Sequence, residues 1–209
     1  MTKRKIAFLP RFMAKIFIFI GFVSIALNSY ASDLQTGDVL LQPLNCWACN
    51  LIEQQEDSIY AHMGVYLKID GDDYIVEAFG KVRLIPLSEF LKKTKGKSRV
   101  KVIRAKSLNH QQRNELLVKS LSLIGSAYDA MFLWDNYIDN TQAFYCSELV
   151  YKIFVEIYKF KYLRPKEMLF DINPEYWDIY FKGETPRNHT GISPEDFHLS
   201  LDFKFVKFL

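Results

Sequence analysis

A change in the spacing of apolar residues near residue 104 limits most strongly what this chain can fold into. Before that point, apolar and polar residues alternate in short runs, and after it the apolar residues recur three and four positions apart. Alternation is typical of β-strands, and a spacing of three and four is typical of α-helices. Strands that precede helices along the chain predict an α+β domain with a mainly antiparallel sheet.

Strands are expected in six segments, at 37–42, 60–67, 74–79, 82–85, 99–104 and 201–208. The second and third segments are separated by a loop that contains Asp70 and Gly71. An Asp-Gly pair between two apolar runs is a strong hairpin signal. We therefore expect these two strands to pair around a loop centred near Ile69 and Asp70, which would place His62 opposite Glu77.

The clearest helix is expected over residues 145–158. Its apolar residues share one face, and they are Cys146, Leu149, Val150, Ile153, Phe154 and Ile157. The segment 46–56 is compatible with a helix but has a weaker pattern. The tail after Phe160 is rich in proline and aromatic residues, and its pattern assigns no element.

A further helix is expected to begin at Asn109. Gln112 follows three residues later, which is the spacing of a capping box. Gly125 is a suitable C-terminal stop, so this helix is expected to end near Ile124. It lies on the helical side of the change in spacing.

The first 31 residues have the composition of a targeting signal. Every charge before Asp33 is basic, and these charges precede an apolar run at 16–27. Ser29 and Ala31 are small residues at the two positions that signal peptidase reads. We expect 1–31 to be a secretory signal peptide, 32–209 to be a single domain, and the protein to be periplasmic. An uncleaved anchor, which would be the protein's membrane contact, is the alternative.

The net charge excludes one class of partner. The chain carries 27 Lys and Arg against 24 Asp and Glu, a net charge of +3. The leader holds five of the basic residues and none of the acidic ones, so its removal would leave −2. A nucleic-acid-binding domain is normally basic, with a clustered patch, and we expect no nucleic-acid partner.

Cys146 is the first candidate for chemistry, because it begins the strongest expected helix. The positive end of the helix dipole and the free N–H groups there favour a thiolate, so the pKa of the thiol should fall. The same N–H groups could hold an oxyanion. Free cysteines are also common as core residues, and this alternative stays open.

His62 and Glu77 lie on the two strands of the expected hairpin. A histidine at the start of a strand is held rigidly enough to act as a general base. Gly64 would leave room on the same face, because residues i and i+2 share a face. A carboxylate opposite the imidazole could fix its tautomer, as in a catalytic triad. A structural histidine and a solvent-facing glutamate are the alternatives.

These residues, taken in order, resemble a known enzyme family. The matching segments are GDVLL from Gly37, YAHMGV from Tyr60, VEA from Val76, YD from Tyr128 and YCSELV from Tyr145. Together they look like the YiiX/YebB-like family of permuted, papain-like (NlpC-type) cysteine hydrolases. The order His, acid, Cys is the permuted order. The resemblance covers residues 34–159, and it leaves out the C-terminal fifty residues and two cysteines, Cys46 and Cys49.

The resemblance implies a permuted papain-like fold in which a sheet packs against a helix that carries the nucleophile. It implies that Cys146 is the nucleophile, His62 the base and Glu77 the residue that orients His62. Tyr128 and Asp129 match a pair placed near the cleft, and with Tyr145 they are expected to contact substrate. A packed tyrosine and a capping aspartate are the alternatives. No metal or organic cofactor is implied.

The Cys46-Trp47-Ala48-Cys49 segment suggests competing interpretations. A C-x-x-C pair in an exported protein is compatible with a structural disulfide, a thiol–disulfide oxidoreductase or, with His62 or Cys146, a zinc site. Thioredoxin-like proteins carry the motif in a βαβ setting, which this chain lacks.

The substrate stays open at this point. Export and kinship to NlpC-type enzymes suggest a cell-envelope peptide amide. The aromatic content of 15% suggests a lipid acyl substrate. An exported protein that binds a lipid or a peptide without catalysis is the alternative to an enzyme.

Overall fold

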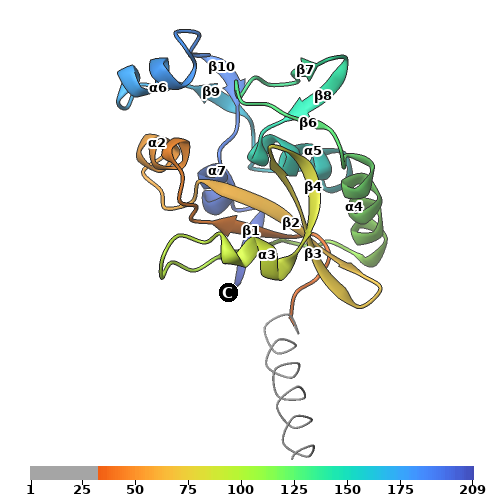
Figure 1. The fold of residues 1–209 in the computed structure, drawn as a ribbon. Helices are drawn as coiled ribbons and strands as arrows, with labels where there is room; N and C mark the ends of the chain where they lie inside the picture. The colour runs from red at the N-terminus through yellow and green to blue at the C-terminus, as the bar shows by residue number, and fades with distance from the viewer. Residues whose placement is uncertain (1–32) are drawn as a thin grey trace, which may run out of the picture. The chain divides into compact units, whose positions relative to one another are not determined.

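A nine-stranded sheet forms the frame of the molecule (Figure 1), with the strand order β11-β5-β1-β2-β3-β4-β6-β8-β7. The computed structural model describes residues 33–209, and the expected signal peptide lies outside this range. The pairs of this sheet are antiparallel except for β6 with β8. A separate two-stranded sheet pairs β9 with β10. No helix among residues 33–209 has the length and apolar character needed to span a bilayer.

The described residues form eleven strands and six helices. The strands are β1 Asp38–Gln42, β2 His62–Ile69, β3 Asp72–Phe79, β4 Lys81–Pro86, β5 Lys101–Ala105, β6 Ala127–Tyr128, β7 Tyr137–Ile138, β8 Thr141–Phe144, β9 Lys166–Met168, β10 His189–Gly191 and β11 Phe203–Phe208. The helices are α2 Trp47–Gln55, α3 Leu87–Lys92, α4 His110–Ser122, α5 Cys146–Tyr158, α6 Pro174–Tyr180 and α7 Pro194–Leu199. The expected α+β class with a mainly antiparallel sheet is confirmed.

The β2–β3 hairpin turns at Asp70 and Gly71, which both have positive φ, 50° and 90°. Two positive φ angles are what a tight two-residue hairpin turn requires. Ile69 pairs with Asp72, so the loop centre lies one residue beyond the expected place. The partners therefore shift by two residues, and Glu77 comes beside Gly64 instead of directly opposite His62. Because the shift is even, His62 and Glu77 still share a face.

Gly64 is required at its position because the neighbouring strand approaches closely. A Cβ at this residue would lie 2.4 Å from Ile75 Cγ2 and 2.9 Å from the Val76 carbonyl oxygen. It would also lie 3.5 Å from Glu77 Cβ. The glycine therefore lets β3 bring the Glu77 side chain close above β2.

Helix α5 packs its apolar stripe onto the sheet, mainly onto β2 and β3. Leu149, Val150, Ile153 and Phe154 are completely buried in the main core. Burial of each such side chain stabilises the fold by about 1.5–3 kcal/mol relative to exposure. Helix α4 also packs against α5. The start of α5 is thereby held at the edge of β2 and β3, where His62 and Glu77 lie.

Helix α4 begins with the expected capping box. The Asn109 side chain accepts from the Gln112 N–H at 2.9 Å, and the Gln112 side chain accepts from the Asn109 N–H at 3.1 Å. The helix ends at Ser122, and Gly125 follows with φ of 95°. The predicted beginning is therefore confirmed, and the end lies two residues before the predicted one.

The C-terminal segment, which the sequence pattern left unassigned, forms β9, α6, β10, α7 and β11. Strand β11 closes the edge of the large sheet against β5. The rest lies near α2 at one end of the molecule (Figure 1), where α2 contacts α6. Trp177 of α6 is fully buried and packs against Phe170, with ring centroids 4.9 Å apart. The aromatic side chains of this segment thus extend the main core.

Candidate active site

His62 and Glu77 form a buried pair at the start of β2 and the end of β3. His62 Nε2 lies 2.7 Å from Glu77 Oε2, and the glutamate side chain is inaccessible to solvent. The His62 ring packs against Phe79 and Phe90, and each ring centroid lies 5.8 Å from that of His62. The imidazole is therefore fixed in orientation, and Nδ1 is the ring nitrogen left for another partner.

Glu77 is held by two cations in addition to His62. Its Oε1 accepts from Arg83 Nη2 at 2.6 Å, from Arg83 Nε at 2.9 Å and from Lys93 Nζ at 2.9 Å. Burial alone would raise the pKa of this carboxyl group, but the bonds and charges of His62, Lys93 and Arg83 lower it to about 2. The carboxylate is therefore ionised throughout the physiological range.

Cys146 is the first residue of α5, and it is free and buried, with 8% of its surface exposed. Its thiol lies close enough to His62 to shift the pKa of the imidazole. Burial of His62 lowers the pKa of the imidazole, whereas the hydrogen bonds and charges of Cys146 and Glu77 raise it to about 9. The structure thus brings the three predicted catalytic residues together in one chain of contacts.

A cleft runs from Cys146 and His62 between α2 and the C-terminal segment. Its volume, counted together with the solvent-filled mouth, is about 690 Å³. Most of the large side chains of its lining are apolar, and they include Ile52, Phe79, Phe132, Met168, Phe170 and Trp177. The cleft therefore suits an apolar group placed next to the thiol.

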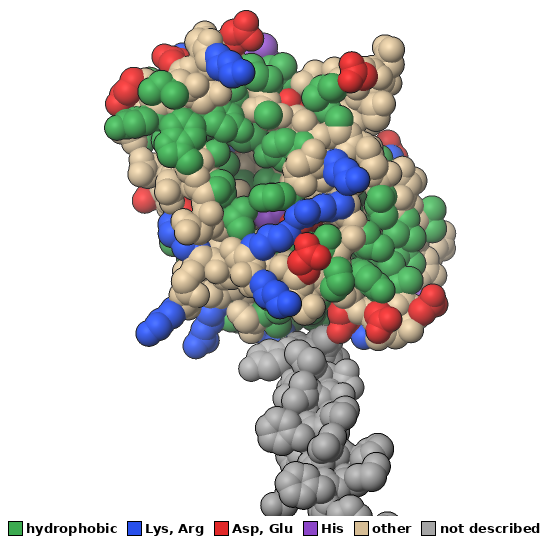
Figure 2. Space-filling model, in the orientation of Figure 1, with side chains coloured by type: hydrophobic (Ala, Val, Ile, Leu, Met, Phe, Trp, Pro, Cys, Tyr) green, Lys and Arg blue, Asp and Glu red, His purple; other side chains and the backbone are tan. Residues whose placement is uncertain are grey.

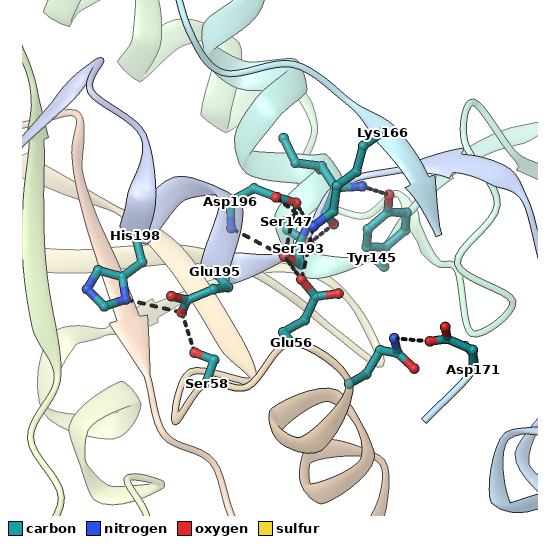
Figure 3. Close-up of polar contacts among 12 residues, drawn as sticks. Glu56, Ser58, Tyr145, Ser147, Lys166, Asp171, Ser193, Glu195, Asp196 and His198 are labelled. Atoms are coloured by element: carbon teal, nitrogen blue, oxygen red, sulfur yellow. Dashed lines mark hydrogen bonds and ion pairs between the residues drawn. The ribbon is translucent and has the colours of Figure 1, made fainter. Parts of the chain in front are cut away.

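Two residues that flank Cys146 bind the C-terminal segment. The Ile192 N–H donates to Tyr145 Oη at 3.1 Å, and Ser147 Oγ donates to the Ile192 carbonyl at 2.7 Å. Figure 3 shows this pair beside a polar cluster at the end of α2 and the start of α7. In that cluster Ser193 Oγ lies 2.8 Å from Glu56 Oε2, which also contacts Lys166 at 3.2 Å. Hydrogen bonds of Ile192 thus connect the C-terminal segment, which lines the cleft, to both neighbours of Cys146.

Of the three residues expected to contact substrate, two line the cleft and one does not. Tyr128 and Tyr145 line the cleft. Asp129 is fully buried and is not part of the lining. Its carboxylate accepts from the Met131 N–H at 2.8 Å and from the Leu133 N–H at 2.6 Å. Asp129 thus caps the turn that carries Phe132 to the cleft.

Sequence reasoning did not identify Glu148, two residues after Cys146. It is fully buried, and its Oε1 accepts from the Asp135 N–H at 2.9 Å. Its Oε2 has no partner among residues 33–209. Burial raises the pKa of this carboxyl group to about 8. The periodic pattern gave no signal for it, because Glu148 lies on the opposite side of the helix from Cys146, Leu149 and Val150.

Cys46 and Cys49 are joined by a disulfide, and Cys146 is not part of it. Cys46 caps the N-terminus of α2, where its Sγ accepts from the Cys49 N–H at 3.0 Å. Both cysteines line the cleft. The strands on either side of α2, β1 and β2, pair in antiparallel fashion, so the motif does not lie in a βαβ unit. The structural-disulfide interpretation is the one that this arrangement matches.

Comparisons with known proteins agree with this geometry. The model of the Peptidase_C92 family, described as permuted papain-like amidase enzyme, YaeF/YiiX, C92 family, matches residues 33–206. The uncharacterized protein YiiX of Escherichia coli K12 is 28% identical over 131 residues, which are 62% of this chain and 62% of that protein. The match therefore spans less than two thirds of the relative.

A solved structure shows the same fold. The crystal structure of metalloprotein YiiX from Escherichia coli O157:H7 matches with a TM-score of 0.74 at 23% identity. The match covers 83% of this chain and 96% of that one. In the part of this chain that the structure describes, no three His, Cys, Asp or Glu side chains are grouped so as to hold a metal ion.

Proposed function

Because the chain belongs to the C92 family of permuted papain-like amidase enzymes, we propose that it is a cysteine hydrolase of amide or ester bonds. Cys146 is the nucleophile, His62 the general base and acid, and Glu77 the residue that orients His62. One observation carries this proposal. A free thiol, an imidazole and an ionised carboxylate contact one another in sequence at the floor of a cleft.

The first half of the reaction forms an acyl-enzyme. The Cys146 thiolate attacks the carbonyl carbon, a C–S bond forms, and the carbonyl electron pair moves onto oxygen. When the oxyanion collapses, the bond to the leaving oxygen or nitrogen breaks. The leaving atom takes the proton of His62, which was the proton of the thiol. Because Nε2 of His62 is held by Glu77, Nδ1 is the nitrogen that carries this proton.

The second half releases the acyl group. His62 removes a proton from water, the hydroxide adds to the thioester carbon, and the C–S bond breaks to return the thiolate. Glu77 stabilises the imidazolium in both halves. Arg83 and Lys93 keep Glu77 ionised, so the proton stays on His62 and does not pass to the carboxylate. These two cations therefore hold the Glu77 carboxylate in place and take no part in the proton transfers.

The start of α5 can stabilise the oxyanion. Tyr145 occupies the N-cap position, and no side chain caps the first turn. The Ser147 hydroxyl, which could have done so, donates to the Ile192 carbonyl instead. The first N–H groups of this 13-residue helix are thus available to a negative oxygen. Donors of this kind each contribute about 2.7–4 kcal/mol to transition-state stabilisation.

The apolar lining favours a substrate whose acyl half is apolar, either a lipid acyl chain or an apolar peptide side chain. We place this activity in the periplasm, as the leader predicts. The Cys46–Cys49 disulfide supports an oxidising compartment. Fractionation of cells that express the full chain would test this placement, and recovery in the cytoplasm would contradict it.

The decisive experiment compares the protein with Cys146→Ala on peptidoglycan fragments and on acyl esters. We expect the alanine variant to lose at least about a thousandfold in kcat/KM on whichever substrate is cleaved. Full activity of this variant would contradict the proposal. Turnover of neither class, with binding retained, would favour a non-catalytic binding protein on the same fold.

A further inference from the structure

We infer that Arg83 and Lys93 form a binding site for an anionic group on the leaving half of the substrate. The inference rests on the proposed function, because that function places the leaving group beside His62. Arg83 belongs to β4, and Lys93 directly follows α3. Neither is part of the cleft lining, so the site lies outside the apolar cleft.

The two cationic groups converge on one atom. Arg83 Nη2 and Lys93 Nζ contact the same oxygen, Glu77 Oε1, at 2.6 and 2.9 Å. Because they touch one atom from different elements, they are close enough for a single further anion to contact both. A phosphate or carboxylate group has the size and the acceptor oxygens for such a contact.

Phe79 links this pair to the cleft. Arg83 Cζ lies 5.0 Å and Lys93 Nζ lies 5.1 Å from the centroid of its ring. The same ring lines the cleft and meets His62 edge-on, with centroids 5.8 Å apart. One phenyl ring thus separates the cations from the cleft on the side of His62.

Both cations keep donors that Glu77 does not use. Arg83 binds Glu77 through Nε and Nη2, and its Nη1 makes no hydrogen bond with the described residues. Lys93 has three N–H donors, and only one contacts Glu77. Their side chains are 27% and 24% exposed, so an anion can reach them from solvent.

The charges around Arg83 and Lys93 sum to a net positive charge. Two cations face the single carboxylate of Glu77, and an imidazolium–thiolate pair of His62 and Cys146 adds no net charge. Glu89 lies 3.8 Å from Lys93 but is half exposed, so solvent screens it. Figure 2 shows basic side chains at one edge of the hollow and hydrophobic side chains at the opposite edge. The two edges therefore suit different halves of one substrate.

The reaction decides which half of the substrate goes where. His62 gives its proton to the leaving atom, so the leaving alcohol or amine must lie on the His62 side of the thiol. The acyl half then occupies the apolar cleft, and the leaving half extends toward Arg83 and Lys93. The substrate class is an apolar acyl ester or amide whose leaving half carries a phosphate or carboxylate.

The first test uses two alkylating agents that differ in charge. Iodoacetate and iodoacetamide both react with Cys146, the free cysteine among residues 33–209, and mass spectrometry follows the modified peptide. The rate ratio of iodoacetate to iodoacetamide reports positive potential near the thiol, and it does not require turnover. We expect Arg83→Gln and Lys93→Gln each to lower this ratio about three- to tenfold at low salt, and Arg83→Lys to restore it.

The matched control is Lys204→Gln, which removes an exposed cation from β11 at the other end of the sheet. It should leave the ratio unchanged. A ratio that neither Arg83→Gln nor Lys93→Gln alters would overturn the anion site, even if the protein proves to be a hydrolase. Conversely, a lowered ratio in a protein without turnover would leave the site standing and reject the hydrolase.

The second test asks whether substrates use the site. Three esters share one acyl chain and differ in a nitrophenol leaving group that is neutral, carries a carboxylate or carries a phosphate. Arg83→Gln should raise KM about tenfold for the charged ester that the site prefers and change KM for the neutral ester little. Loss of the contact with Glu77 would lower kcat equally for all three esters and does not bear on the anion site. A KM that Arg83→Gln changes equally for the neutral and the charged esters would overturn the inference. The better of the two charged esters identifies the source of the anion.

Discussion

The two regions that form the cleft achieve their stability by different means. The floor, from β2, β3 and the start of α5, holds buried charges that contact one another, with Glu77 bound by His62, Arg83 and Lys93. The wall, from α2 and the C-terminal segment, is mainly aromatic, and its buried Trp177 leaves the indole N–H without a partner among residues 33–209. The floor thus sets the protonation states for chemistry, and the wall sets the shape that a substrate must fit.

The largest effect is expected at the floor, from Glu77→Gln. This change removes the charge that supports the imidazolium, so we expect kcat/KM to fall about a hundred- to a thousandfold, mainly in kcat. The matched control is Glu89→Gln, which removes the half-exposed carboxylate beside Lys93 and should cost little. Equal losses in both variants would show that the floor does not depend on the buried pair.

The pH dependence of the floor follows from the two pKa shifts. His62 is raised from 6.5 to about 9, so its stabilisation is complete below pH 6.5 and is lost as pH rises through 9. Glu77 is lowered from 4.5 to about 2, so its stabilisation is complete above pH 4.5 and is lost as pH falls through 2. We expect kcat/KM to decline above about pH 9. In Glu77→Gln, the pKa of His62 should be lower, so the decline should begin at a lower pH. A pH–rate profile whose alkaline limb did not move would argue against this coupling.

At the wall, Trp177→Ala should mainly affect stability and binding. Removal of a fully buried indole should lower the free energy of unfolding by about 3–5 kcal/mol, measured by urea denaturation. In the fraction that stays folded, KM for an apolar acyl ester should rise more than kcat falls. Tyr176→Ala, on the exposed side of the same helix, is the control and should change both little. A fall in kcat without a rise in KM would contradict the assignment of substrate binding to the wall and of catalysis to the floor.

On α5, Glu148→Gln should raise the free energy of unfolding in a pH-dependent way. The pKa of Glu148 is raised from 4.5 to about 8, so the folded state favours the neutral acid and loses that advantage as pH rises through 8. We expect the glutamine variant to match the parent near pH 4.5 and to be more stable by about 5 kcal/mol at pH 8.5. Glu156→Gln, on the same helix with a side chain 75% exposed, should show no such trend. Thermal melts at the two pH values would decide.

The smallest effect is expected where floor and wall meet. Tyr145→Phe leaves the Ile192 N–H without its acceptor, which should cost about 1–2 kcal/mol of stability and a few-fold in KM. Tyr137→Phe, with an exposed ring, is the control. A loss in kcat as large as that of Glu77→Gln would mean that Tyr145 belongs to the floor.

Sequence reasoning reached the floor because local spacing specifies it. The Asp70-Gly71 turn specifies a hairpin, and the apolar stripe of α5 specifies which helix begins at Cys146. The register was two residues out because the turn centre lies between Asp70 and Gly71. The contact of Glu77 with Arg83 also had a local signal, since Gly80 turns the chain and the two residues pair directly in β3 and β4. Lys93 had none, because it reaches Glu77 only through the placement of α3.

The wall shows the opposite relation between sequence and structure. Its segments are short, and the positions of α6, β9, β10 and α7 depend on contacts with residues far away in the chain. Ile192 binds Tyr145 and Ser147 from 47 and 45 residues away. A periodic pattern reports only which face of an element is apolar, and it does not report which distant element covers that face.

The sequence by itself therefore determined the α+β class, the hairpin that carries His62 and Glu77, the helix that begins at Cys146 and the family, because each depends on neighbouring residues. The tertiary structure decided the contact of Lys93 with Glu77, the burial of Glu148 and the apolar wall. These features depend on charges and rings that are distant in the chain. Such groups acquire their pKa values, partners and substrate contacts only when folding removes water from between them.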